Sequence, residues 1–476
     1  MADVELDALV ATLREAMPEL SVAGSTEGIR VADVVLDSRA VTPGSIFCAL
    51  VGQTSDGHDH AAAAIESGAV ALLCERPLGL GVPEIRTRFG RSAMALLASE
   101  VHGRPSTALD VVGVTGTNGK TTVTHMVQAI LEASGRPTGV IGTLSGVRTT
   151  PEAPELQRRL AELRDSGRTA AAIEVSSHAL AQHRVDATRF RVAVFTNLSR
   201  DHLDYHGTME AYFQAKARLF EPELAERAVV NLDDPYGRLL LDAAQVPTVG
   251  YSLDDAADLE LGLDRSRFTW RDVAVELPLG GRFNVSNALA AATTAALLGA
   301  SPQAVADGLA RLPSIAGRFE VIDLRAPYTV VVDFAHTPDG LARVLEAARE
   351  VVGEHRVHVV FGCGGDKDRT KRPAMGEVAD RLADTVVLTS DNPRSEDPRS
   401  IIEDTLAGVR RTEGVVVEPD RRAAIATALE AAGPGDLVIV AGKGHEKYQE
   451  VAGEQRPFDD AVVVREEHAR LGGGCA

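Results

Sequence analysis

The stretch VVGVTGTNGKTTVTHMV, Val111–Val127, decides the fold that we expect for this chain. It begins as a short apolar β run and continues from Thr121 with the apolar spacing of a helix. Between the two, Gly116 and Gly119 permit a tight turn, so that backbone N–H groups and the N-terminal end of the helix face an anion. Lys120 would then contact the β- and γ-phosphates of a nucleotide, and Thr121 would supply an oxygen ligand to Mg²⁺.

Residue 114 is valine, where the strict phosphate-loop pattern has its first glycine. The alternative is therefore a glycine-rich turn between a strand and a helix that binds no phosphate. The sequence Gly-Lys-Thr-Thr soon after a β run favours the phosphate loop, because a lysine and a hydroxyl at that spacing serve phosphates and Mg²⁺.

Length and composition are those of a globular protein with several domains. The 476 residues are 45% hydrophobic and 25% charged, and this length is enough for about three domains. The net charge of −19 argues against binding to nucleic acid or to anionic membranes. No apolar run approaches the ~18 residues of a membrane-spanning helix, and the acidic, amphipathic N-terminus is unlike a signal peptide. We expect a cytoplasmic protein without membrane insertion, with reduced thiols at Cys48, Cys74, Cys363 and Cys475.

Strand-like and helical runs alternate along the chain, which predicts an α/β fold. We expect a small α/β domain over residues 1–103. Residues 104–318 would form a central, P-loop-like domain with a mostly parallel sheet. Residues 319–476, with four strand-then-loop units, would form a C-terminal Rossmann-like domain.

Polar side chains follow two further apolar runs of the central segment. Glu174 ends one run, and the loop after the next presents Asn197, Asp201 and His202. Such groups at the ends of neighbouring parallel strands would complete a Mg²⁺ shell. The alternative is a set of solvated loop residues that cap the next helix, and for Asp204 and His206 both interpretations stay open. Chemistry alone makes Lys216, in the helical AYFQAKARLF, a solvated surface charge.

A rigid turn, TSDNPRSEDP at Thr389–Pro398, follows an apolar β-branched run near the C-terminus. Pro393 ends the strand and Arg394 is held at the tip of the turn, at the strand end where doubly wound folds bind ligands. The alternative for Arg394 is a surface salt bridge with Glu396 or Asp397.

The motifs, taken together and in this order, resemble those of the Mur ligases: GVTGTNGKTT, EVSSHAL, TNLSRDHLDYHGTMEAYFQAKARLF, NLDDPYG, GRFNVSNALAA, VVDFAHTPDGL, FGCGGDKDRTKRPAMG, DNPRSEDP and GKGHEKYQ. The resemblance covers roughly residues 36–460. It implies a UDP-MurNAc-binding N-terminal domain, a central ATP-binding domain and a C-terminal domain that receives an amino acid. It also implies a monomer that acts in peptidoglycan precursor synthesis. In that reaction, ATP would phosphorylate the D-glutamate γ-carboxylate of UDP-MurNAc-L-Ala-D-Glu, and an amine would displace the phosphate.

The resemblance also implies roles for individual residues. The ATP site would consist of Gly116, Thr117, Asn118, Gly119, Lys120, Thr121, Thr122, Asn287, Arg318, Asp333 and His336. The UDP-MurNAc-dipeptide site would consist of Leu36, Ser38, Gln53, Thr54, Ser55, Thr149, Thr150, Ser176, Gln182 and Arg184. Catalysis would depend on Lys120, Glu174, His202 and Lys216. Two Mg²⁺ ions would be held by Thr121, Glu174, His202 and Lys216, the last as a carbamate.

The same resemblance implies that the amino acid added is meso-diaminopimelate. This residue differs from lysine chiefly by a distal carboxylate, which a guanidinium binds through two parallel hydrogen bonds. The implied site comprises Lys367, Asp391, Asn392, Pro393, Arg394, Gly442 and Glu446. Lys367 stands where the family usually has arginine, so it keeps the charge and loses the bidentate geometry. The alternatives are a lysine-adding form, a sibling Mur or folylpolyglutamate-type ligase, and a nucleotide-gated scaffold without catalysis.

Overall fold

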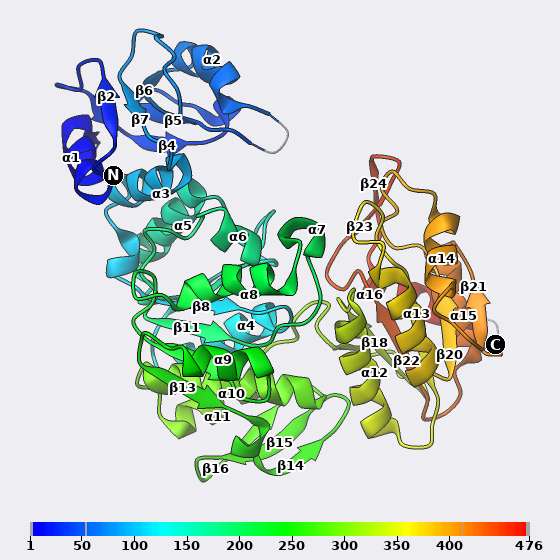
Figure 1. Ribbon diagram of the computed structural model, residues 1–476. Coiled ribbons are helices and arrows are strands. Elements are labelled where there is room, and N and C mark those ends of the chain that lie inside the picture. The colour runs from blue at the N-terminus through cyan, green and yellow to red at the C-terminus, as the bar shows by residue number, and fades with distance from the viewer. Residues whose placement is uncertain (1–2, 53–54, 412, 473–476) are drawn as a thin grey trace.

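The computed structural model describes residues 3–52, 55–411 and 413–472. Within these ranges the chain forms three sheet-containing regions in chain order, at the upper left, the centre and the right of Figure 1. The predicted α/β class with three domains is confirmed. No helix among the described residues is long and apolar enough to cross a membrane.

The N-terminal region is a five-stranded sheet in the order β2-β7-β6-β5-β4, in which only the β2–β7 pair is antiparallel. Side chains of β5 and β6 alternate between two cores: Ile46 and Leu73 face α1 and α3, and Phe47 and Leu72 face α2. The elements are β1 (Val4–Glu5), α1 (Leu6–Ala16), β2 (Ser21–Ala23), β3 (Arg30–Val31), β4 (Asp33–Val35), β5 (Ser45–Ala49), α2 (Ala61–Glu66), β6 (Ala69–Cys74), β7 (Glu84–Arg86) and α3 (Gly90–Val101).

The central region contains a six-stranded, fully parallel sheet in the order β13-β12-β11-β8-β10-β9. Its helices and strands are β8 (Asp110–Thr115), α4 (Lys120–Ala133), β9 (Thr138–Ile141), α5 (Ala153–Asp165), β10 (Ala170–Glu174), α6 (Ser177–Ala181), β11 (Val192–Phe195), α7 (Leu203–His206), α8 (Met209–Ala217), β12 (Ala228–Asn231), α9 (Pro235–Asp242), β13 (Thr248–Tyr251), β14 (Ala257–Leu261), β15 (Ser266–Trp270), β16 (Val273–Leu277), α10 (Arg282–Leu297) and α11 (Pro302–Ala310).

Helices cover both faces of this sheet, as a parallel sheet requires. Val112 and Val114 of β8 pack with α4, α10, α11 and the small antiparallel sheet β14-β15-β16. Val111 faces the opposite core, which α5, α6, α8 and α9 complete. Because β8 lies between β10 and β11, the loops that follow these three strands meet at one edge of the sheet.

The C-terminal region has a six-stranded sheet in the order β17-β18-β22-β19-β20-β21, parallel except for β17. One face packs against α12, α13 and α14 and the other against α15 and α16. The elements are β17 (Glu320–Ile322), β18 (Thr329–Asp333), α12 (Pro338–Val352), β19 (Val357–Phe361), α13 (Lys371–Leu382), β20 (Thr385–Leu388), α14 (Pro398–Leu406), β21 (Val415–Val417), α15 (Arg421–Ala431), β22 (Leu437–Ala441), β23 (Tyr448–Val451), β24 (Glu454–Pro457) and α16 (Asp460–Gly472).

Polar contacts join the central and C-terminal regions. Asn118 Nδ2 donates to Asp339 Oδ2 at 3.1 Å, and Arg282 pairs with Glu350 at 2.6 Å. The carboxyl ends of the two large sheets therefore border a shared space, which is the setting of the site described next.

Candidate active site

The phosphate loop connects β8 to α4 at the edge of the central sheet. Gly116 and Gly119 have φ angles of 151° and 88°. A Cβ atom at Gly116 would overlap the hydroxyl of Thr196, so this position requires glycine. Lys120 opens α4, and its Nζ donates to the carbonyl oxygen of Gly116 at 3.0 Å. Burial lowers the pKa of Lys120, because it disfavours the charged form of the amine.

Glu174, the last residue of β10, lies beside this loop. Its Oε2 accepts hydrogen bonds from Thr121 Oγ1 at 2.9 Å and from Thr143 Oγ1 at 3.1 Å. Arg318 Nη2 reaches the same Thr121 hydroxyl at 3.1 Å from the start of the C-terminal region. The carboxylate of Glu174, the hydroxyl of Thr121 and the guanidinium of Arg318 thus lie together at the N-terminal end of α4.

The oxygen atoms of Thr121 and Glu174 suit a hard cation. Among the described residues, no group of three or more histidine, cysteine, aspartate or glutamate side chains is arranged to hold a metal. Mg²⁺ does not need such a cage, because it usually takes one or two carboxylates together with phosphate oxygens and water. Thr121 and Glu174, which both line the cleft, fit this pattern.

The loop after β11 supports the phosphate loop from the other side. Thr196 Oγ1 donates to the carbonyl oxygen of Asn118 at 2.6 Å, and Asn197 Oδ1 accepts the Asn118 N–H at 3.0 Å. His202 follows with a φ of 54° and lines the cleft, with its ring edge-on to His178 at 4.7 Å between centroids. Asn197 therefore shapes the phosphate loop, and His202, whose side chain is 43% exposed, lines the cleft.

Asp204 and His206 lie in the short helix α7. His206 Nε2 is 2.9 Å from Ser177 Oγ, and its ring contacts Tyr212 at 5.1 Å. Burial lowers the pKa of His206 to about 4. Neither residue is among those that line the cleft.

Lys216 is not the solvated surface charge that its helical position alone indicated. Its side chain is 1% exposed, and Nζ donates to the carbonyl oxygen of Gly116 at 2.9 Å. The ring of Tyr212, one turn earlier in α8, covers it at 4.7 Å. Burial and the nearby Lys120 lower the pKa of Lys216 well below its usual value. No local sequence signal indicated this burial, because the contact with Gly116 joins residues 100 positions apart.

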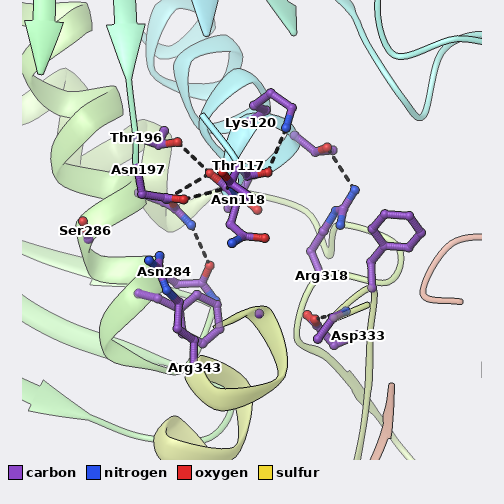
Figure 2. Close-up of a pocket in the computed structure, with 18 of the residues that line it drawn as sticks. Thr117, Asn118, Lys120, Thr196, Asn197, Asn284, Ser286, Arg318, Asp333 and Arg343 are labelled. Atoms are coloured by element: carbon purple, nitrogen blue, oxygen red, sulfur yellow. Dashed lines mark hydrogen bonds between the residues drawn. The ribbon is translucent and has the colours of Figure 1, made fainter. Parts of the chain in front are cut away.

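A cavity of about 320 Å³ opens between the central and C-terminal regions (Figure 2). In Figure 2, Asn118 and Lys120 lie in the upper half of the view, Arg343 lies below them, and Arg318 and Asp333 lie to the lower right. The cleft lining includes ten of the eleven residues that the resemblance assigns to ATP, all except Gly116.

Asp333, the last residue of β18, is a buried carboxylate. It accepts N–H groups from Phe319 at 2.6 Å and from Ala335 at 2.8 Å. Burial raises the pKa of Asp333 to about 6, against the opposing effect of Arg318.

Several residues that line this cleft were not predicted from the sequence. Asn231 and Tyr251 are the last residues of β12 and β13, and the rule that ligands bind at the carboxyl ends of parallel strands would have indicated both. Helix positions such as that of Arg343, on α12, carry no comparable signal. The missed residues are Asn231, Tyr251, Phe283, Asn284, Ser286, Arg343 and Val344.

The residues assigned to the sugar nucleotide and its dipeptide lie in two places. Leu36, Ser38 and Ser55 belong to the N-terminal region, and Gln53 and Thr54 lie outside the described residues. Thr149, Thr150, Ser176, Gln182 and Arg184 belong to the central region, where Thr150 Oγ1 donates to the Glu174 carbonyl oxygen at 2.7 Å.

Arg184 already has an acidic partner in the chain. It pairs with Glu152 at 3.0 Å and donates to Gln182 Oε1 and to the Thr150 carbonyl oxygen. Glu152 also pairs with Arg91 of α3 at 3.3 Å, so this carboxylate joins the N-terminal and central regions.

Six of the seven residues assigned to the amino acid lie in the loops after β20 and β22, and Lys367 lies in the loop after β19. Asn392 Nδ2 donates to Glu446 Oε2 at 2.7 Å, and the buried Lys443 Nζ donates to Asn392 Oδ1 at 3.1 Å. Gly442 has a φ of 112°, and a Cβ there would approach the Asp391 carboxylate to 2.5 Å. Burial, with Asp391 nearby, raises the pKa of Glu446.

Arg394 does not pair with Glu396 or Asp397, and its acidic partner in the structure is Glu450. Its Nη1 donates to the Gly365 carbonyl oxygen at 2.7 Å, and its Nε lies 3.5 Å from Glu450 Oε2. Glu396 instead points toward α13, because its carboxylate accepts hydrogen bonds from Arg372. The side chain of Arg394 is 27% exposed and remains open to a ligand.

The fold and the cleft define a nucleotide-binding α/β enzyme whose phosphate loop faces a second, Rossmann-like region. Three family models match the chain: the Mur ligase family catalytic domain at residues 30–99, the Mur ligase middle domain at 114–295 and the Mur ligase glutamate ligase domain at 317–444. The chain belongs to the Mur ligase family and is an ATP-dependent ligase that forms an amide bond.

Two similar relatives are each named UDP-N-acetylmuramoyl-L-alanyl-D-glutamate--2,6-diaminopimelate ligase. The protein of Streptomyces avermitilis is 44% identical over 95% of this chain and 96% of its own. The protein of Solibacter usitatus is 46% identical over 92% of this chain and 93% of its own. A solved structure with that name shares 37% identity and a TM-score of 0.69, over 99% of this chain and 100% of that one. The fold is also that of Thermotoga maritima MurF ligase in complex with ADP, at 21% identity and a TM-score of 0.67 over 94% of this chain and 99% of that one.

Proposed function

We propose that this ligase adds meso-2,6-diaminopimelate to the D-glutamate γ-carboxylate of UDP-MurNAc-L-Ala-D-Glu. The observation that carries the proposal is the half-buried Arg394 in the turn after β20, in a chain 44–46% identical over at least 92% of its length to ligases named for this reaction. The alternatives of a lysine-adding form or a scaffold lack a comparable observation in the described residues.

ATP would occupy the cleft with its phosphates at the loop before α4. Lys120 and Arg318 would neutralise charge on the γ-phosphoryl group, because both cations lie at the N-terminal end of that helix. The D-glutamate γ-carboxylate would attack the γ-phosphorus, so that an acyl phosphate forms and ADP leaves. The amine would then attack the acyl carbon, and inorganic phosphate would leave as the amide bond forms.

Mg²⁺ would be held by Thr121 and Glu174, with His202 and a carbamate on Lys216 around a second ion. The donor set supports this assignment, because the Thr121 hydroxyl and the Glu174 carboxylate lie 2.9 Å apart and both line the cleft. A bound Mg²⁺ would neutralise developing negative charge on the phosphoryl oxygens.

Lys216 is suited to carbamylation because a buried lysine with a lowered pKa presents a neutral amine. That amine would attack carbon dioxide; an N–C bond forms, one proton leaves, and the product is an anion. The anion would sit beside the cationic Lys120, which removes the unfavourable proximity of two ammonium groups.

The amino acid would bind between the turn at Arg394 and the segment Gly442–Glu446. Arg394 would hold the distal carboxylate with parallel hydrogen bonds, and Glu446 would pair with an ammonium group. Lysine would offer no distal carboxylate to Arg394, so the same contact favours diaminopimelate over lysine. Lys367 would add a second positive charge to this site with less directional binding than an arginine.

The UDP end would bind in the N-terminal region near Leu36, Ser38 and Ser55, and the dipeptide near Thr150 and Arg184. The anionic substrate would compete with Glu152 for Arg184. Because ATP and UDP-linked precursors are cytoplasmic compounds, we place the reaction in the cytoplasm.

Phosphate release by the full chain tests the proposal. With ATP, Mg²⁺, UDP-MurNAc-L-Ala-D-Glu and meso-diaminopimelate together, we expect stoichiometric phosphate and a product heavier by one diaminopimelyl residue. Omission of any one substrate should abolish both signals. Phosphate release that does not depend on the amino acid, or a product without it, would contradict the proposal.

A further inference from the structure

Two facing loops of the C-terminal region each contain a strained residue. One loop follows β19 and includes Asp366, and the other follows β20 and includes Arg394. Both residues are non-glycine and both have a φ of 52°. L-amino acids other than glycine adopt this left-handed conformation when surrounding contacts impose it, and such residues concentrate at functional sites.

Hydrogen bonds between the loops impose this conformation. Ser395 Oγ donates to Asp366 Oδ1 at 2.7 Å, and the Ser395 N–H donates to Asp366 Oδ2 at 3.2 Å. In the other direction, the Gly365 N–H donates to the Asn392 carbonyl oxygen at 2.9 Å, next to the Arg394 contact with Gly365. The carboxylate of Asp366 therefore holds the residue that follows Arg394.

Glu396 completes the connection between the loops. Its Oε1 accepts the Asp366 N–H at 2.7 Å and Arg372 Nη2 at 2.8 Å, and its Oε2 accepts from Arg369 at 2.6 Å. The Glu396 side chain is 15% exposed and that of Arg372 is fully buried. Arg372 Nη2 also donates to the Gly364 carbonyl oxygen at 3.2 Å. The ion pair of Glu396 and Arg372 therefore connects the two loops.

We propose that Glu396 and Asp366 are positioning residues. They hold the two loops in the relative position in which both loops can bind the amino acid. They act through Lys367, which follows Asp366, and through Arg394, and they do not touch the substrate themselves. The inference rests on the proposed function, because Lys367 and Arg394 read the amino acid in that proposal. A displacement of about 1 Å between two groups that bind the amino acid is enough to lower kcat/KM strongly.

A role confined to stability is the competing explanation, and substitutions at Asp366 separate the two. Asp366→Gly removes the carboxylate but accepts a positive φ without strain, so the folded state is not penalised by backbone conformation. Asp366→Asn tolerates the left-handed region and keeps an oxygen that accepts from Ser395, so it is the conservative variant.

For Glu396 the variant is Glu396→Gln. Arg372 keeps an acidic partner in this variant, because it also pairs with Asp404 at 2.9 Å. Glu403→Gln, at an exposed position on α14, is the matched control.

The measurement is the KM for diaminopimelate and for ATP, kcat, and the melting temperature of each variant. We expect Asp366→Gly and Glu396→Gln to raise the KM for diaminopimelate by ~10-fold, with kcat and the KM for ATP within about two-fold of wild type. Asp366→Asn and Glu403→Gln should stay near wild type. An unchanged KM for diaminopimelate in both Asp366→Gly and Glu396→Gln, whatever their melting temperatures, would overturn the inference.

Amide hydrogen exchange of the free protein tests the coupling without any substrate. Glu396→Gln should accelerate exchange in residues 363–368 and 392–396 together, and Glu403→Gln should not. Unchanged exchange in both segments would overturn the inference. A wild-type protein that is inactive with diaminopimelate would refute the proposed function, while the exchange result still decides whether the loops are coupled.

Discussion

The side-chain nitrogens of Lys120 and Lys216 lie 3.0 and 2.9 Å from the same carbonyl oxygen, that of Gly116. Two ammonium groups at this distance from one acceptor repel each other, and Lys216 is the more strongly affected because it is buried beneath Tyr212. The pKa of each lysine is lowered, that of Lys216 well below its usual value. The arrangement favours a neutral Lys216 beside a charged Lys120.

The first prediction concerns carbamylation of Lys216. In buffer with ¹³C-bicarbonate, wild-type protein should show a carbamate carbon signal by NMR that is absent from Lys216→Met. Lys216→Met should also lose at least ~10²-fold in kcat, because it removes a ligand-forming group from the phosphoryl-transfer site. Lys447→Arg, at an exposed position, is the control and should behave as wild type. An active wild-type protein without a carbamate signal would contradict this prediction.

The second prediction concerns the pH dependence of stability at Asp333. The pKa of this carboxyl is about 6 in the folded protein, above its ordinary value of 3.8, so the folded state binds the proton more tightly than the unfolded state. The stability of wild type relative to Asp333→Asn should therefore be highest below pH 4 and should decline as the pH rises through 6. The total decline should be on the order of 3 kcal/mol.

Denaturant unfolding of both proteins between pH 4 and 8 measures this difference. A difference in unfolding free energy that is constant over that range would show that Asp333 titrates normally. Asp333→Asn should also weaken ATP binding, because the variant changes a group that lines the cleft.

The third prediction concerns the Mg²⁺ requirement at Glu174. Glu174→Gln replaces an oxygen that accepts from Thr121 and Thr143 with an N–H donor, so it removes the anionic donor next to the phosphates. We expect a loss of ~10²-fold in kcat and a higher Mg²⁺ concentration for half-maximal phosphate release. Glu162→Gln, exposed on α5, is the control. An unchanged Mg²⁺ titration would remove Glu174 from the proposed metal site.

The fourth prediction concerns the contribution of Arg394. Arg394→Ala should lower kcat/KM for diaminopimelate by ~10²- to 10³-fold, since a buried ligand carboxylate would lose its charged partner. The KM for ATP should stay within about two-fold, and turnover with lysine, which lacks that carboxylate, should change little. Arg399→Ala, exposed on α14, is the control. An unchanged KM for diaminopimelate would show that another residue binds the distal carboxylate.

Much of the fold and part of the site could be predicted from the sequence, because local chemistry determines them. The turn after β8 can be predicted from its own residues, Gly116, Gly119 and Lys120. Glu174 can be recognised in the sequence because it is the polar residue that ends an apolar run. Parallel strands then bring such ends together, so the sequence indicates which residues meet without showing the distances between them.

Residues that depend on packing between distant segments could not be assigned in the same way. Lys216 donates to the carbonyl oxygen of Gly116, and this contact joins residues 100 positions apart in the sequence. Glu396 is two residues from Arg394 in the sequence, yet the Glu396 carboxylate accepts a hydrogen bond from Arg372 of α13. Arg343 enters the cleft only because α12 packs beside the central region. These contacts follow from the tertiary arrangement.

The measurement that tests the central claim most directly is a comparison of two amino acids as substrates. With saturating ATP and UDP-MurNAc-L-Ala-D-Glu, kcat/KM is measured for meso-diaminopimelate and for L-lysine on the wild-type protein. We expect diaminopimelate to be preferred by at least ~10²-fold, because Arg394 has a carboxylate to bind in one case and none in the other. An equal or higher kcat/KM for lysine would contradict the account.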